Sequence, residues 1–152
     1  MIYQFFFPAL YWLALIICGI YVLKRGGSLE RRVLWLLVCM SVLSVLVSMM
    51  DDNRFHSTGY GLLALDLLLL AILMRIALTS ARYWPIWAAG FHMISVITHL
   101  AVMAVPDLVP TAYALVQGLW AYPVFASLAL GARWVSRGWV PDETSRRRGA
   151  PF

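Results

Sequence analysis

Charged residues are scarce in this chain. They make up 12% of its 152 residues, whereas apolar residues make up 62%. Soluble domains average about 25% charged and roughly 45–50% apolar residues, and a soluble core of this size could not bury so much apolar surface. The composition therefore excludes an ordinary soluble domain and predicts a protein whose solvent is lipid.

Cysteine, histidine and catalytic motifs are also rare or missing. Cys18 and Cys39 both lie in apolar runs and are too few for a disulfide framework. The sequence has no nucleophile elbow, phosphate-binding loop or HExxH motif, so we expect no enzyme activity. Met49, Met50 and His56 lie near one another in the chain, but their spacing matches no metal motif and we predict no metal site.

What the chain has instead is a series of five apolar runs, each close to the roughly 20 residues that a helix needs to cross a bilayer. They cover about residues 2–23, 33–50, 60–78, 83–105 and 111–132. We predict an all-α integral membrane protein with one five-span domain over residues 1–140. Trp134 and Trp139 predict a short interfacial segment, and residues 141–152 a polar cytoplasmic tail.

Basic residues indicate the orientation of these spans. The formal net charge is +5, but the lysines and arginines lie in short clusters between apolar runs, which argues against a nucleic-acid partner. If the spans alternate in direction, only Arg54 falls on the opposite side from the other basic residues. The positive-inside rule then predicts that the N-terminus is outside and the C-terminus cytoplasmic.

Several residues predict local features at the ends of the spans. Ser28 is predicted to cap the second helix in a partial capping box, because Arg31 stands where Glu or Gln is preferred. Tyr83 and Trp84 are predicted to be aromatic anchors at the membrane interface. Pro123 is predicted to kink the last span, because it removes one backbone donor.

Four polar residues are predicted to lie at one depth in the bilayer. Counted inward from the predicted outer ends of their spans, Ser44, Asp66, His99 and Gln117 are each six residues deep, or about 9 Å at the helical rise. Polar side chains in lipid need partners, so these residues predict an intramembrane polar layer. Two interpretations stay open: the layer acts as structural glue between helices, or Asp66 orients His99 for proton transfer, ion passage or cofactor ligation.

The histidines predict a second kind of site. His92, Ser95 and His99 share one face of the fourth span, and a small residue precedes each histidine by four positions. A small side chain one turn before a histidine leaves room for a flat ring to lie against the helix. His92 or His99 is therefore a candidate ligand for haem or a chlorophyll-type pigment. The two histidines are about 10.5 Å apart along the helix axis, too far to clamp one iron, and a bis-histidine haem would need a partner subunit.

One resemblance concerns the last two spans. The segment RYWPIWAAGFHMISVITHLA, followed by PDLVPTAY and a last span that contains tryptophan, resembles short bacterial inner-membrane proteins with no assigned activity. The resemblance implies a place in the bacterial cytoplasmic (inner) membrane. It implies no reaction, cofactor or substrate.

Three hypotheses for function follow. The first is a non-enzymatic accessory or scaffolding subunit, or a homo-oligomer, that packs against a larger respiratory or photosynthetic complex, because the chain has little mass outside the membrane. The second is a cofactor-binding membrane protein that uses His92 or His99. The third is a small proton-linked or ion-conducting protein that uses Asp66 and His99.

Overall fold

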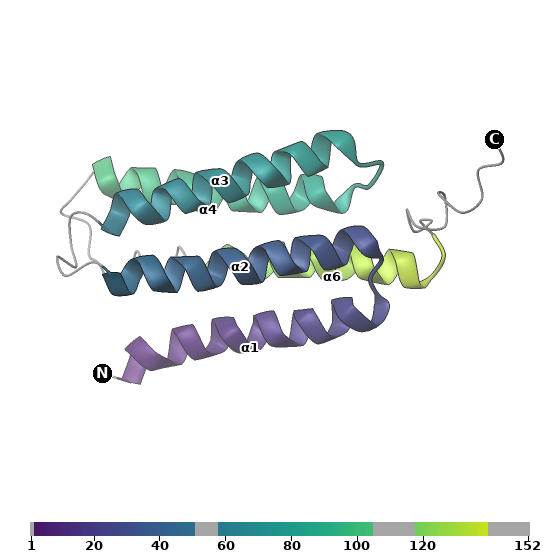
Figure 1. Cartoon of the computed structure of the whole chain (residues 1–152), viewed down its shortest axis with the longest axis horizontal. Coiled ribbons are helices and arrows are strands. Elements are labelled where there is room, and N and C mark those ends of the chain that lie inside the picture. Colours follow the sequence, from purple (N-terminus) through teal and green to yellow (C-terminus); the bar gives the residue numbers. More distant parts are fainter. Residues whose placement is uncertain (1, 51–57, 105–117, 140–152) are drawn as a thin grey trace.

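The computed structural model describes residues 2–50, 58–104 and 118–139. In these ranges the chain forms five α-helices: α1 (Ile2–Arg25), α2 (Ser28–Met50), α3 (Thr58–Thr79), α4 (Trp84–Ala104) and α6 (Ala121–Ser136). Figure 1 shows the helices lying side by side along one common axis. The all-helical prediction is confirmed, while the predicted tail at residues 141–152 lies outside the described residues.

Three helices are long and apolar enough to cross a membrane. Within the described ranges these are residues Phe7–Arg25, Ser28–Met49 and Tyr60–Thr79, which lie in α1, α2 and α3. Large apolar side chains cover their outer faces, and Ile17, for example, is 60% exposed. Hydrocarbon tolerates such a surface, whereas water would not. The chain is therefore a helical protein suited to a membrane, and the count of five spans stays a prediction.

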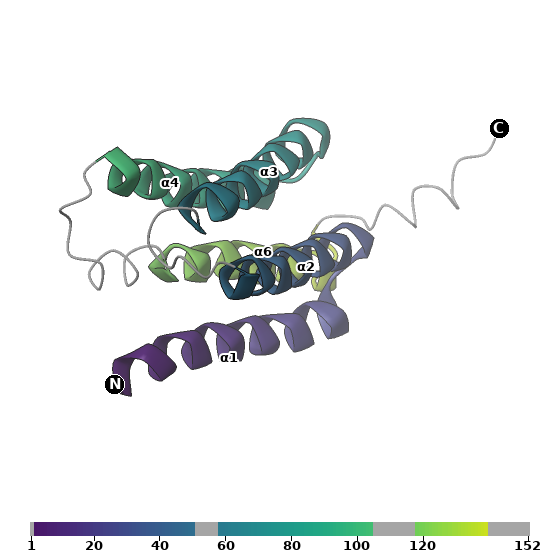
Figure 2. The same cartoon turned by 60° about the vertical axis from the view of Figure 1, so that its left-hand side comes forward.

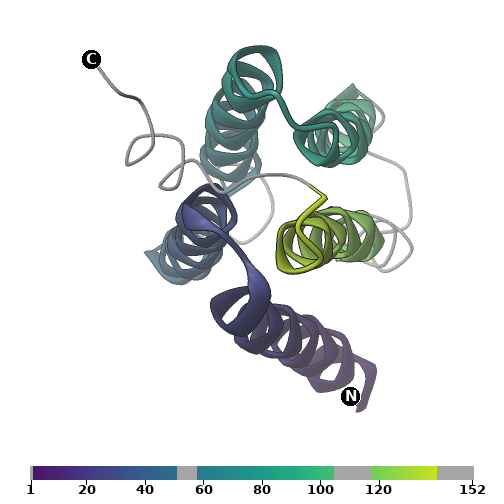
Figure 3. The same ribbon diagram turned by 90° about the vertical axis from the view of Figure 1, so that its right-hand side faces the viewer.

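The helices form a ring around a common interior. Going round the ring the order is α1, α2, α3, α4 and α6, and α6 then packs against α1; α2 and α6 also touch each other across the interior. The turned view in Figure 2 and the end-on view in Figure 3 show this arrangement. The buried core includes Leu15, Val22, Leu73, Trp84 and Leu128. Every helix thus has one face toward the interior and one toward the outside of the bundle.

Positive charge gathers at one end of the bundle, which we call the basic end. The α1–α2 and α3–α4 connections and the last turn of α6 all lie there (Figure 1). In the described part of the chain all the lysines and arginines belong to this end: Lys24, Arg25, Arg31, Arg32, Arg75, Arg82, Arg133 and Arg137. This one-sided distribution agrees with the sequence count on which the predicted orientation depends.

The turn between α1 and α2 is tighter than the sequence predicts. Gly26 closes α1 with a 2.7 Å hydrogen bond from its N–H to the carbonyl of Val22, and a Cβ at Gly26 would lie 2.6 Å from that oxygen. Gly27, and not Ser28, is the N-cap of α2, because its carbonyl accepts the first helical bond, from the N–H of Arg31. The capping prediction was wrong by one residue, because two residues suffice for this turn.

That shift places Glu30, and not Arg31, at the third helical position, where a capping box takes a carboxylate. Its Oε2 accepts a 3.1 Å hydrogen bond from the N–H of Gly27. Its Oε1 accepts two more, from Nη1 of Arg82 at 2.8 Å and from Nε1 of Trp84 at 3.0 Å. Glu30 is completely buried. One carboxylate therefore joins the α1–α2 turn to the α3–α4 connection.

The Trp84 side chain extends this connection to α6. The anchor prediction for Trp84 was wrong, because its indole is completely buried and does not lie at an interface; Tyr83 beside it is 72% exposed. A Cβ built on Gly131 of α6 would lie 2.6 Å from Nε1 and 2.7 Å from Cγ of Trp84. Because Gly131 has no side chain, it leaves the space on α6 that the indole ring of Trp84 occupies.

The start of α6 reflects Pro123. Residues 118–119 are helical, the helix is interrupted at Trp120, and α6 begins at Ala121. Pro123 has no N–H with which to bond the carbonyl four residues earlier, at Leu119. Trp120 keeps right-handed helical backbone angles, φ −69° and ψ −15°, and Pro123 lies in the first turn of α6, where a missing donor costs little. The predicted kink stays a prediction.

Replacing Glu30 by alanine is expected to destabilise the bundle by about 3 kcal/mol or more, because breaking a buried ion pair leaves a buried charge poorly compensated. Unfolding of the purified protein in mixed micelles, followed by circular dichroism, measures the loss. Arg31→Ala, at the adjacent exposed position, is the control and should stay within about 0.5 kcal/mol of wild type. Equal losses for both variants would contradict the assignment.

Gly131→Ala is expected to cost about 1–3 kcal/mol, because the added methyl overlaps the indole of Trp84 and forces one of them to move. Gly90→Ala is a matched control in the middle of α4, where an added Cβ meets nothing within 4 Å. That change should be neutral or stabilising by up to about 1 kcal/mol, from helix propensity alone. The same unfolding assay compares the two.

Candidate functional site

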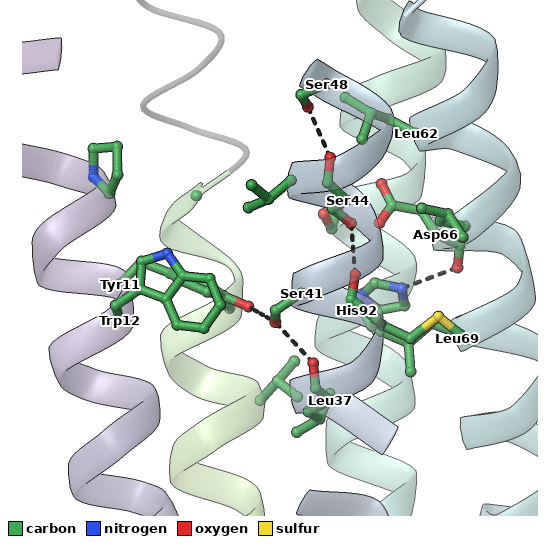
Figure 4. Close-up of a pocket in the computed structure, with 18 of the residues that line it drawn as sticks. Tyr11, Trp12, Leu37, Ser41, Ser44, Ser48, Leu62, Asp66, Leu69 and His92 are labelled. Carbon is green, nitrogen blue, oxygen red and sulfur yellow. Dashed lines mark hydrogen bonds between the residues drawn. The ribbon is translucent and has the colours of Figure 1, made fainter. Parts of the chain in front are cut away.

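The interior of the ring holds a cavity in the half of the bundle away from the basic end. Its volume is about 590 Å³, and all five described helices contribute to its wall. Figure 4 shows Tyr11 and Trp12 of α1 on one side, Asp66 of α3 on the other, and Ser41 and Ser44 of α2 between them. The polar residues of the wall are Tyr11, Ser41, Ser44, Ser48, Asp66, His92 and Ser95.

Asp66 and His99 form a hydrogen-bonded pair at this site. Oδ2 of Asp66 and Nδ1 of His99 are 3.0 Å apart, so one proton lies between them whichever atom carries it. The side chain of His99 is 4% exposed, whereas that of Asp66 is 22% exposed and reaches the cavity. The pair therefore consists of a buried histidine and an aspartate that is accessible from the cavity, and together they can hold or release a proton.

His92 is held by the backbone of the same aspartate. Its Nε2 lies 3.0 Å from the carbonyl oxygen of Asp66, as Figure 4 shows. A carbonyl only accepts hydrogen bonds, so Nε2 must carry the proton and donate it. His92 and His99, seven residues apart on α4, thus both contact Asp66. The ring of His92 contacts its backbone, and the ring of His99 contacts its side chain.

The hydroxyl groups of the α2 wall donate their protons to the helix itself. Ser41 donates to the carbonyl of Leu37 at 2.7 Å, Ser44 to that of Met40 at 2.9 Å, and Ser48 to that of Ser44 at 2.8 Å. Tyr11 and Ser41 are 2.5 Å apart. Because Ser41 has already used its proton, Tyr11 must be the donor in that bond.

The structure brings together part of the predicted polar layer. Asp66 contacts His99 directly, and Ser44 lines the same cavity as Asp66. Gln117 lies outside the described residues. His92, which the sequence analysis offered as a cofactor ligand, takes part in the same arrangement through the Asp66 backbone.

Ser95, which shares the helix face of His92 and His99, lines the site as well. Tyr11 and Ser41 also belong to the site, and they were not predicted as site residues. Each is an ordinary residue in an apolar helix, and their meeting depends on which helices are neighbours. Ser41 does carry a sequence signal, because it stands three residues before Ser44 and so on the same side of α2. Tyr11 carries none, since depth alone does not say that α1 packs beside α2.

Cofactor ligation by the histidines stays a prediction. His92 and His99 each direct one ring nitrogen to Asp66, and His92 lines the cavity. In the described part of the chain no three His, Cys, Asp or Glu side chains gather in a way that could hold a metal ion. Cys18 and Cys39 are both free thiols.

A cysteine placed at Ser44 is expected to react with a water-soluble, membrane-impermeant methanethiosulfonate reagent, because a cavity of this size with a carboxylate and several hydroxyl groups on its wall admits water. The background is Cys18→Ala with Cys39→Ala. Leu46→Cys is the control: Leu46 is 48% exposed on a helix face that does not line the cavity, where lipid keeps the thiol protonated and unreactive. Mass spectrometry of protein labelled in intact membranes measures both, and equal labelling would contradict a water-accessible cavity.

Comparisons with known proteins add no functional assignment to this geometry. No protein-family model, no curated protein and no solved structure matches the chain. The resemblance of the last two spans to short bacterial inner-membrane proteins therefore stays a prediction, and the function must be argued from the site itself.

Proposed function

We propose that this chain is a small proton-linked membrane protein in which Asp66 and His99 take up and release protons at the wall of the central cavity. The observation that carries the proposal is their 3.0 Å hydrogen bond at the edge of a cavity into which the carboxylate reaches. An aspartate within an apolar helix is costly, and such residues mark ion or proton pathways by default.

Exposure to the cavity favours this function over a purely structural one. A carboxylate that served only to hold α3 against α4 would gain most from complete enclosure, as Glu30 does at the basic end. Asp66 instead keeps a 22% exposed side chain. That exposure provides a route by which protons reach the pair from water in the cavity.

The charge states of the pair fit proton exchange. With one labile proton beyond the single N–H that a neutral imidazole always carries, the pair is neutral overall, either as carboxylic acid and imidazole or as carboxylate and imidazolium. Loss of that proton leaves one net negative charge in a low-dielectric setting, and gain of another leaves one net positive charge. Both changes are costly unless something compensates them, so water and counter-ions that reach the cavity must offset the charge as protons pass.

For the membrane setting we propose a multi-pass protein of the bacterial inner membrane with five spans. α4 and the segment that ends in α6 would be the fourth and fifth spans, beside the three helices that are apolar enough on their own. The N-terminus would then be outside and the basic end cytoplasmic, as the distribution of arginine and lysine favours. The cavity would open toward the outer side.

The accessory-subunit and cofactor hypotheses are the alternatives. Outward-facing aromatic residues such as Trp35, 61% exposed, would suit contact with a partner protein as well as with lipid. A bound haem or pigment would give the protein, gently purified from its native membrane, an absorption band that disappears in His99→Ala. Neither alternative requires a carboxylate at a cavity.

The test is proton flux in proteoliposomes that contain the purified protein and a pH-sensitive dye. An imposed pH gradient should decay faster with wild type than in empty liposomes, and Asp66→Asn should return the rate to that of empty liposomes, because the amide of asparagine does not ionise. Ser127→Ala is the control, since Ser127 bonds the Pro123 carbonyl and does not line the cavity. Wild-type flux no faster than in empty liposomes would overturn the proposal and favour the accessory role.

A further inference from the structure

We infer that the cavity binds a small organic ammonium ion, a protonated amine, in exchange for one proton of the Asp66–His99 pair. This inference rests on the proposed function and names the ligand class of the same site. It is drawn from three features of the wall: the direction of its hydrogen bonds, its aromatic surface and its charge.

The first feature is an excess of acceptors. Ser41, Ser44 and Ser48 donate their only hydroxyl protons to backbone carbonyls, and Tyr11 donates its hydroxyl proton to Ser41. Each of these oxygens keeps at least one lone pair that no side-chain proton occupies, although Ser41 already accepts the proton of Tyr11. Together with the carboxylate of Asp66, the cavity presents oxygen acceptors to whatever enters it. A ligand rich in N–H donors satisfies such a wall, whereas an anion meets repulsion.

Two side chains on the wall can still donate. The Ser95 residue is 8% exposed and lines the cavity, and within the described part of the chain its hydroxyl has no hydrogen-bond partner. This hydroxyl can rotate to accept as readily as to donate, and a nearly buried group of this kind calls for a partner. The Trp12 indole is the remaining donor, and its ring face has a second role.

The second feature is an aromatic wall opposite the carboxylate. Tyr11 lies edge-on to Trp12 with ring centroids 5.9 Å apart, and 5.4 Å from the ring of Phe125. All three residues line the cavity, and Figure 4 shows Tyr11 and Trp12 across the space from Asp66. Ring faces attract cations, and organic ammonium ions are commonly bound between aromatic rings and a carboxylate. The volume of about 590 Å³ also exceeds what a bare alkali ion would fill.

The third feature is charge balance. The titratable groups that face Asp66 are His92 and His99 of α4 and Tyr11 of α1, and Tyr122 of α6 lies within electrostatic range of Tyr11; the α2 wall presents serines. When the pair loses its labile proton it carries one net negative charge, and a monocation in the cavity restores neutrality. Because a net charge in this setting is costly, binding of one ammonium ion should release one proton.

The experiment uses the full-length protein in detergent micelles with benzylammonium chloride as the probe. Calorimetry in weak buffer at pH 7 measures affinity, and a pH-sensitive dye counts the protons released. We expect close to one proton per ion bound, no binding in Asp66→Asn, and affinity weaker by about three- to tenfold in Ser44→Ala, which removes one neutral acceptor. Ser127→Ala, a back-bonded serine outside the cavity, should bind as wild type does.

Further outcomes distinguish this inference from the function on which it rests. Asp66-dependent proton flux without benzylammonium binding would overturn the inference and leave the proposed function standing. Binding that Asp66→Asn does not change, or binding without proton release, would also overturn it. Sodium or potassium ions that displace benzylammonium at similar concentrations would identify an alkali-cation site instead. Loss of both flux and binding in Ser44→Ala, with the helical circular dichroism also lost, would show misfolding, and Ser41→Ala then replaces it.

Discussion

The rest of the bundle depends on the buried hydrogen bonds that the carboxylate of Glu30 accepts. In a membrane the apolar faces of helices gain little from meeting one another, because lipid is as apolar as they are. Polar contacts and close packing must therefore fix which helices are neighbours. Glu30 accepts hydrogen bonds from Gly27, Arg82 and Trp84, and the buried indole fits against Gly131. One side chain thus relates α2 to both helical connections and, through Trp84, to α6.

The two halves of the bundle differ in how far their paired polar groups are exposed. At the basic end the charges of Glu30 and Arg82 face each other at 2.8 Å and are sealed from solvent. In the other half the helices line a partly open cavity, and Asp66 reaches it while His99 stays buried. A sealed pair holds a structure in place, whereas an accessible pair can exchange protons. This difference in exposure is the physical reason for separating the structural pair Glu30–Arg82 from the candidate functional pair Asp66–His99.

Much of the candidate site was open to prediction from the sequence. Counting residues inward from the ends of the spans placed Asp66 level with His99, and their side chains do meet. The count works because short connections fix the register of antiparallel neighbours, and each residue adds a constant rise. The structural role of Glu30 was not predicted, because an acidic residue in a loop rich in arginine and lysine is usually a solvated surface group. Only the two-residue turn at Gly26 and Gly27 reveals that it lies at a capping position.

The sequence by itself determined the helical class, the presence of helices apolar enough to cross a membrane and the end at which positive charge gathers, because composition, run length and charge clusters are read directly from the residues. Only the tertiary structure decided which faces turn inward. These helices are apolar on all sides, so the usual periodicity that marks a buried face is weak. The meeting of Tyr11 with Ser41, the bracketing of Asp66 by two histidines and the burial of Trp84 all follow from the lateral order of the ring, which contacts between distant residues set.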